Sequence, residues 1–289
     1  MRGRLARSVA VVIMLGGALV AVGGGTEQVP KRYLFQDRSE LVPSEPSSLG
    51  TAACADPAGT LHPWTVPITP NDASEKYYID VSGAPSDLSG EDVKFDVQSG
   101  FASWNNEYND CGRSDSSNFV FASLGATTRY PSLFEEGSGS DNCPEQPNEG
   151  MRLDGYNDVA FISLDGPGGT LAEVRVCAEF NPSGRDRVLE WDIAFDSAED
   201  WQTTISPSAG VIDIYNVATH EAGHVVGVAH VSGDPDSCVS LNPQSVHKYL
   251  TMFRCSWPEA IVHRTLGLGD MLKLEYIVGV RPCDDPAEC

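Results

Sequence analysis

The sequence predicts an α+β fold in one main domain. Several short apolar runs are bounded by Gly, Asp, Asn or Pro clusters, as strands are, and three segments suit helices. Their order along the chain is strand, helix, strands, helix, helix, which suggests α+β. With 289 residues, of which 41% are hydrophobic, the chain can bury a substantial core.

The first 24 residues resemble a secretory signal peptide. Arg2, Arg4 and Arg7 precede an apolar run at 9–22, and small residues follow it. The alternative is an uncleaved membrane anchor, but the run is short for a bilayer span of roughly 20 residues. We therefore expect a secreted, extracellular protein without stable membrane association.

Residues 25–61 are predicted to form a linker or a short pro-segment, because they are rich in Pro, Ser, Glu and Gly and show little periodicity. Order resumes at Trp64, so we place the folded domain at 62–281. Residues 282–289 are expected to form a short tail that contains two cysteines.

The first strand of the domain is expected at 76–81, which is rich in aromatic and β-branched residues. A helix follows, because Val93, Val97, Phe101 and Trp104 recur at spacings of four, four and three. Four further strands are then expected at 119–124, 159–164, 171–176 and 191–195.

A second helix is predicted to begin after Asp213, a residue type that suits the N-cap position. Ile214, Val217 and Val225 can line one face of this helix. A last helix is expected over 268–277, where three apolar residues are available for burial.

The eight cysteines all follow the signal segment, and their even number predicts disulfide bonds in an oxidising compartment. Their spacing makes Cys238–Cys255 and Cys283–Cys289 the first pairs to expect. A cysteine zinc site is the alternative, and no C-x-x-C pair supports it.

The chain is strongly acidic, with 41 Asp and Glu against 19 Lys and Arg and a formal charge of -22. This charge argues against nucleic acid or anionic membranes as partners. A well-solvated surface, calcium sites or adaptation to high salt could each explain it.

The run HEAGHVVGVAH at 220–230 contains the candidate metal-binding and catalytic residues. His220 and His224 are four residues apart, so a helix places both imidazoles on one face, where they can bind the same metal ion. Gly227 can adopt the left-handed conformation that ends a helix, and the turn can return His230 as a third ligand. Histidines on a polar surface or in a core are the competing interpretation, but this many fixed positions rarely coincide by chance.

Three neutral imidazoles leave a Zn²⁺ ion with an open position for a water molecule, whose pKa can fall to about 7. Glu221 adjoins the first ligand and would act as general base on that zinc-bound water, then pass the proton to the departing amine. The other histidines, His62, His247 and His263, have no such pattern and are interpreted as ordinary residues.

This run resembles the signature of the metzincin zinc proteases. The resemblance implies a twisted mixed five-stranded sheet with an active-site helix and two further helices. It also implies a methionine turn beneath the zinc, and Thr251-Met252-Phe253 is similar to that turn. Met252 would then support the histidines without binding the metal.

Within the metzincins, most of 64–280 resembles the matrixins. Their calcium-binding loop and the segment that completes it are similar to 165–172 and 195–201 here. The resemblance implies one structural Ca²⁺ with oxygen ligands. The implied ligands are Asp165, Gly166, Gly168, Asp196 and Glu199.

The chain departs from the matrixin pattern in two respects. The histidines that hold a second, structural zinc in matrixins are replaced by Asp158, Glu173 and Ala194, so we expect that zinc to be absent. The matrixin latency motif P-R-C-G-x-P-D is also missing. Cys54 could cap the zinc instead, although the even cysteine count favours a disulfide.

Together these features predict a secreted, monomeric endopeptidase with one catalytic Zn²⁺, which hydrolyses internal peptide bonds of proteins lying beside the edge strand. The alternative is a catalytically silent secreted calcium- or protein-binding module on a metzincin scaffold. That alternative would be marked by a damaged ligand or base, and none is damaged here.

Overall fold

The computed structural model describes part of the chain. The described residues are 32–41, 51–61, 64–65, 74–114, 117, 119–135, 143, 153–181, 186–203, 211–231, 238 and 246–278. The expected signal peptide at 1–24 and the tail at 282–289 lie outside them. Among the described helices, none combines the length and the apolar character that a membrane crossing requires.

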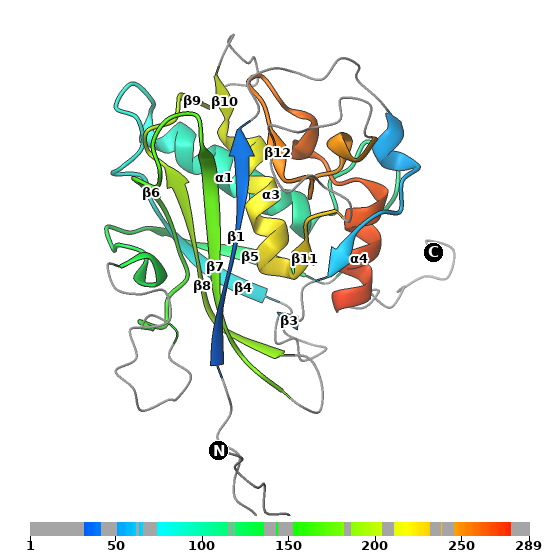
Figure 1. Ribbon diagram of the computed structural model, residues 1–289, viewed down its shortest axis with the longest axis horizontal. Coiled ribbons are helices and arrows are strands. Elements are labelled where there is room, and N and C mark those ends of the chain that lie inside the picture. The colour runs from blue at the N-terminus through cyan, green and yellow to red at the C-terminus, as the bar shows by residue number, and fades with distance from the viewer. Residues whose placement is uncertain are drawn as a thin grey trace, which may run out of the picture.

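A mixed sheet forms the centre of the fold (Figure 1). Its strands are β1 (Arg32–Leu41), β3 (Trp64–Thr65), β4 (Ser74–Asp80), β5 (Val120–Ala126), β6 (Asp158–Ile162), β7 (Thr170–Glu179), β8 (Asp186–Asp196) and β12 (Cys255–Ser256). They are ordered β12-β1-β7-β8-β6-β4-β5, and β3 pairs with β8. β4, β5, β6 and β8 are parallel, whereas β7 is antiparallel to β8.

Two helices, α1 (Gly90–Asn105) and α3 (Ile214–Val226), lie against one face of this sheet (Figure 1). The apolar positions that predicted the first helix are all buried. The helices approach closely, since a β-carbon on Gly100 would lie 2.6 Å from that of Ala218. Nε1 of Trp104 also donates a 2.7 Å hydrogen bond to the carbonyl of Thr219. These contacts fix α3 against the core.

A third helix, α4 (Leu268–Val278), is coloured red in Figure 1. The remaining short elements are η1 (Thr51–Cys54), β2 (Thr60–Leu61), η2 (Ser132–Phe134), β9 (Trp201–Gln202), β10 (Ile212–Asp213), β11 (Val228–Ala229), η4 (Val246–Tyr249) and η5 (Val262–Arg264). Each of the five expected strands and three expected helices corresponds to an element of the structure.

The structure corrects the sequence-based expectation in one place. Part of the segment interpreted as a linker, 32–41, forms β1. Together with the short strands β3 and β12, it brings the sheet to eight strands in the described part of the chain rather than five. The sequence of β1, RYLFQDRSEL, is polar and lacks a regular apolar pattern. It joins the sheet through backbone hydrogen bonds, which hydrophobic periodicity does not reveal. The pro-segment alternative stays a prediction.

Three disulfide bonds join described cysteines. Cys238–Cys255 was expected from the sequence and is confirmed, and Cys54–Cys111 and Cys143–Cys177 add to it. Because Cys54 is oxidised, it is not available to cap a metal ion. Cys283 and Cys289, the other expected pair, lie outside the described residues.

Candidate metal centre

The two ends of α3 determine where the histidines of the 220–230 run lie. At the first end, Oδ1 of Asp213 accepts a 2.7 Å hydrogen bond from the backbone N–H of Asn216, which is the expected N-cap contact. Arg264 donates to the same carboxylate through Nε at 2.9 Å. At the other end, Gly227 has φ 105° and ψ 17°, the left-handed conformation that turns the chain towards His230.

The three histidines bring their Nε2 atoms together. Nε2 of His220 lies 3.1 Å from that of His224 and 3.1 Å from that of His230, and the remaining pair is 3.2 Å apart. Nitrogens at this spacing can all reach one ion at the usual Zn–N distance of roughly 2.0–2.1 Å. These three side chains therefore form a group that could hold a metal ion.

The outer nitrogens of these rings have partners that orient them. Nδ1 of His220 lies 2.7 Å from the carbonyl oxygen of Thr251, and Nδ1 of His224 lies 2.9 Å from that of Val228. A carbonyl oxygen only accepts, so each Nδ1 carries the hydrogen and each Nε2 presents its lone pair inward. Burial lowers the pKa of both rings, which favours the neutral form that a metal requires.

Glu221 lies beside this cluster with no exposed surface. Its Oε1 accepts a 2.7 Å hydrogen bond from the hydroxyl of Ser39, whereas its Oε2 is buried and has no hydrogen-bond partner among the described residues. Burial raises the pKa of Glu221 well above its usual range. A carboxylate with one free oxygen and a raised pKa suits the transfer of a proton.

Met252 lies beneath α3 and is fully buried. Its sulfur packs against Gly223, the residue between the two helical ligands. The backbone of Met252 also accepts a 3.1 Å hydrogen bond from Val231, directly after His230. The turn at 251–253 therefore contacts the first ligand through Thr251 and the segment of the third ligand through Met252.

Two residues of β1 contact this centre, and sequence reasoning missed both. Oδ1 of Asp37 lies 3.1 Å from Nδ1 of His230, and Ser39 donates to Glu221. No motif marks them, because they lie in the polar segment interpreted as a linker. A weak signal could have been their spacing of two, which places both side chains on one face of an extended strand.

The expected calcium ligands lie together at the end of β6 and β8. The backbone N–H groups of Asp165 and Gly166 donate to Asp196, at 3.2 and 2.9 Å, and that of Gly168 donates to Glu199 at 2.6 Å. The carboxylate of Asp165 accepts from Thr170. The loop is thus closed by its own hydrogen bonds, and calcium binding stays a prediction.

The positions that replace the second-zinc histidines have other roles. Asp158 accepts two hydrogen bonds from Arg129, at 3.0 and 2.7 Å. Glu173 pairs with Arg175 at 2.7 Å, and Ala194 is buried. Ionic and apolar contacts therefore occupy the places where those ligands would lie.

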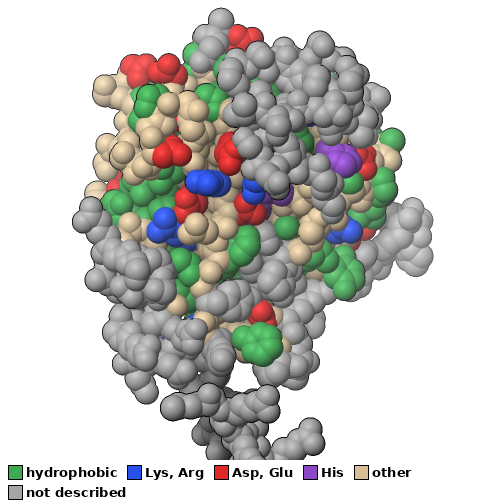
Figure 2. Space-filling view, viewed as in Figure 1, with side chains coloured by type: hydrophobic (Ala, Val, Ile, Leu, Met, Phe, Trp, Pro, Cys, Tyr) green, Lys and Arg blue, Asp and Glu red, His purple; other side chains and the backbone are tan. Residues whose placement is uncertain are grey.

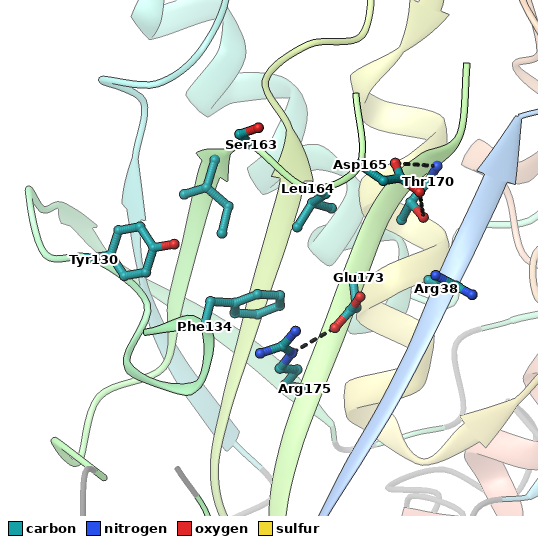
Figure 3. Close-up of a pocket in the computed structure, with 10 residues that line it drawn as sticks. Arg38, Tyr130, Phe134, Ser163, Leu164, Asp165, Thr170, Glu173 and Arg175 are labelled. Atoms are coloured by element: carbon teal, nitrogen blue, oxygen red, sulfur yellow. Dashed lines mark hydrogen bonds and ion pairs between the residues drawn. The ribbon is translucent and has the colours of Figure 1, made fainter. Parts of the chain in front are cut away.

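A pocket of about 260 Å³ lies on the face of the sheet away from α3 (Figure 3). Its lining residues are Arg38, Tyr130, Phe134, Ile162, Ser163, Leu164, Asp165, Thr170, Glu173 and Arg175. None of His220, His224 and His230 lines it. The pocket is therefore separate from the metal centre.

The surface agrees with the charge of the sequence. On the face shown in Figure 2, the described Lys and Arg side chains form separate spots beside Asp and Glu rather than a continuous basic surface. The expectation that the chain does not bind nucleic acid stays a prediction.

Comparison with known proteins shows which family this site is similar to. Residues 154–248, which include the three histidines and Glu221, match the family model described as matrixin. Stromelysin-3 of Homo sapiens is 30% identical over 139 residues, which are 44% of this chain and 26% of that protein. Matrix metalloproteinase-17 of Homo sapiens is 36% identical over 69 residues, 24% of this chain and 10% of that protein. The chain thus spans about a quarter or less of these relatives.

Proposed function

Because the chain contains a matrixin-like metalloprotease domain, we propose that it is a secreted zinc-dependent endopeptidase that acts as a monomer on internal peptide bonds of proteins. The observation that carries this proposal is the convergence of three Nε2 atoms beside a buried carboxylate. His220, His224 and His230 would hold one Zn²⁺. When bound, the ion polarises the scissile carbonyl and lowers the pKa of water.

The proton transfers and the positioning of the ligands are carried out by residues of the protein. Oε2 of Glu221 has no hydrogen-bond partner among the described residues, so it can take a proton from the attacking water. Because burial raises the pKa of Glu221, the carboxyl group can hold that proton until the amine departs and then deliver it. The turn at 251–253 keeps the first ligand in place through the carbonyl of Thr251.

The substrate is an extended segment of protein that aligns with β7. Backbone groups along a strand edge bind any extended peptide, whatever its side chains, which suits an endopeptidase. A catalytically silent module would require a lost ligand or base. All three ligands and Glu221 lie together in the structure, which favours the enzyme.

The test is hydrolysis of casein or gelatin by zinc-loaded protein, in the wild type and in Glu221→Gln. We expect the substitution to lower the rate at least about a hundredfold, while zinc content and melting temperature stay close to wild type. Glu91→Gln is the matched control, because Glu91 lies on the exposed face of α1. Hydrolysis that survives Glu221→Gln would contradict the proposal.

Both proteins are assayed in the full-length form and after a cut between residues 41 and 51, because Ser39 and Asp37 of β1 contact Glu221 and His230 in the uncut chain. A protein that binds zinc but hydrolyses neither substrate in either form would also contradict the proposed activity.

A further inference from the structure

β1 lies between β7 and β12, beside the metal centre (Figure 1), and the space between these two strands is called the groove below. It is antiparallel to β7, with Asp37 opposite Val174 and Ser39 opposite Ala172. On its other side it is parallel to β12, with Glu40 opposite Cys255. The chain is thus hydrogen-bonded on both edges, as an extended peptide held in a cleft would be.

Hydrogen bonds near the end of β1 show how firmly it is held. The N–H of Glu40 donates to the carbonyl of Arg254 at 3.1 Å, and the N–H of Leu41 donates to that of Gly169 at 3.0 Å. One partner belongs to the segment before β12 and the other to the loop before β7. β1 therefore bridges the two walls of the groove.

The side chains of β1 also cover the reactive groups. The hydroxyl of Ser39 donates to Glu221 at 2.7 Å, and Asp37 lies 3.1 Å from Nδ1 of His230. Asp37 is also 3.9 Å from the guanidinium of Arg254. The general base and the third ligand are thus both engaged by residues 37–39.

A substrate needs the same space. To be hydrolysed, a peptide must bring its scissile carbonyl beside Glu221 and the three histidines. Without β1, the strand edge next to them would be that of β7. The backbone groups along that edge are paired with β1. β1 and a substrate therefore exclude each other from the groove.

β1 is suited to leave the groove. Among its described side chains only Ser39 is buried, while Gln36 and Arg38 are exposed. Its apolar residues Leu34, Phe35 and Leu41 are only partly buried at the margins of the core. By contrast, β7 is buried along most of its length and pairs with β8. The loss of β1 would expose little core, and the rest of the sheet would keep its pairing.

We propose that residues 32–41 are an intramolecular pseudosubstrate, which occupies the substrate groove and keeps the metal centre latent until the strand leaves. This inference rests on the proposed function. In this arrangement Ser39 blocks the general base, Glu221, and Asp37 blocks the third ligand, His230. Latency here therefore depends on a serine and a carboxylate rather than on a cysteine. Cys54, the cysteine considered from the sequence, is paired with Cys111.

The experiment uses the full chain with a recognition sequence for a site-specific protease inserted between residues 41 and 51. The folded protein is cut there, and the uncut form of the same protein is the control. Three measurements follow: hydrogen exchange of the β7 amides, binding of a fluorescein-labelled peptide with the sequence of 32–41, and casein hydrolysis. The first two are repeated without zinc, so that they do not depend on turnover.

After the cut, we expect faster amide exchange in β7, saturable binding of the labelled peptide and at least about tenfold faster hydrolysis. Added peptide should slow that hydrolysis again. In the uncut chain, the double substitution Asp37→Ala and Ser39→Ala should also raise hydrolysis. Gln36→Ala, on the exposed side of β1, should leave the uncut chain unchanged.

The outcomes separate the two proposals. Hydrolysis that is equally fast before and after the cut would overturn latency and leave the endopeptidase proposal standing. Unchanged amide exchange with no peptide binding would make β1 a permanent strand of the sheet and would also overturn the inference. Release of β1 with peptide binding, but without hydrolysis, would support occupancy of the groove and contradict the proposed activity.

Discussion

Gly223 and Met252 pack so closely that a β-carbon on Gly223 would overlap the methionine sulfur and lie 2.5 Å from Cζ2 of Trp104. Glycine normally weakens a helix interior by roughly 0.5–1 kcal/mol relative to alanine. Here it stands between two proposed metal ligands because the turn at 251–253 and α1 leave no room for a side chain. This close packing explains why position 223 is a glycine, which the spacing of the histidines alone does not explain.

Substitution of Gly223 by alanine should therefore destabilise the protein, although alanine is the better helix former. We expect a net loss of about 1–3 kcal/mol in the free energy of unfolding, because the overlap outweighs the gain in helix propensity. Urea unfolding of the zinc-free protein measures this loss. In a Met252→Ala background the same substitution should cost less, and an equal cost in both backgrounds would contradict the packing argument.

Removal of the metal should lower the melting temperature. An ion bound only by the folded state stabilises it by about 4 kcal/mol at a concentration a thousand times its dissociation constant. Scanning calorimetry with and without a zinc chelator should show this shift in the wild type and in His247→Ala, since His247 lies outside the cluster. His224→Ala should show no shift. A chelator effect of the same size in His224→Ala would argue against this site.

Calcium should bind at the loop formed by 165–170 with Asp196 and Glu199. We expect one ion per chain and a higher melting temperature, because the added charge would offset repulsion among three neighbouring carboxylates. Isothermal titration of protein treated with a calcium chelator measures the binding. Asp165→Asn should weaken it and Asp87→Asn, on the exposed surface, should not. Absence of binding would show that hydrogen bonds alone close the loop.

Acid should destabilise the protein through His263. Burial lowers the pKa of this ring to about 4 from 6.5, so between these values the unfolded chain binds more protons than the folded one. Stability is therefore complete above pH 6.5 and falls as the pH falls towards 4, by on the order of 3 kcal/mol. His263→Gln removes the titrating group but lowers stability at every pH.

The contribution of His263 is isolated by comparing how the free energy of unfolding depends on pH in the wild type and in His263→Gln. Burial raises the pKa of Asp270 to about 6, which makes its contribution to stability fall as the pH rises and so opposes that of His263. Urea unfolding between pH 4 and 6.5, with a chelator present, measures how the free energy of unfolding changes with pH. This slope should be smaller in His263→Gln than in the wild type, by up to the amount that the binding of one proton contributes. Identical slopes in the two proteins would contradict the assignment.

Much of the fold follows from local patterns. The spacing of Val93, Val97, Phe101 and Trp104 predicts α1, and all four are buried. Asp213 and Gly227 mark the ends of α3 because each satisfies a requirement of a helix terminus that depends on neighbouring residues alone. The five expected strands were recognisable for the same reason, since each is apolar and bounded by turn residues.

β1 could not be predicted in this way. Its polar sequence has no period that distinguishes a strand from a linker, and its partner β7 lies more than a hundred residues away. Strand pairing through the backbone depends on which edge is available after folding. For the same reason, Cys238–Cys255 was expected from proximity in the sequence, whereas Cys54–Cys111 was not.

The three histidines, Glu221 and the ends of the helix that presents them could be recognised from the sequence, because they depend on the spacing of residues that are close together in the chain. Their surroundings depend on the tertiary structure. Ser39 reaches Glu221 from 182 positions away, and Met252 reaches Gly223 from beyond the third ligand. Such contacts exist only once the sheet and helices have packed, because side chains distant in sequence meet through the shape of the whole core.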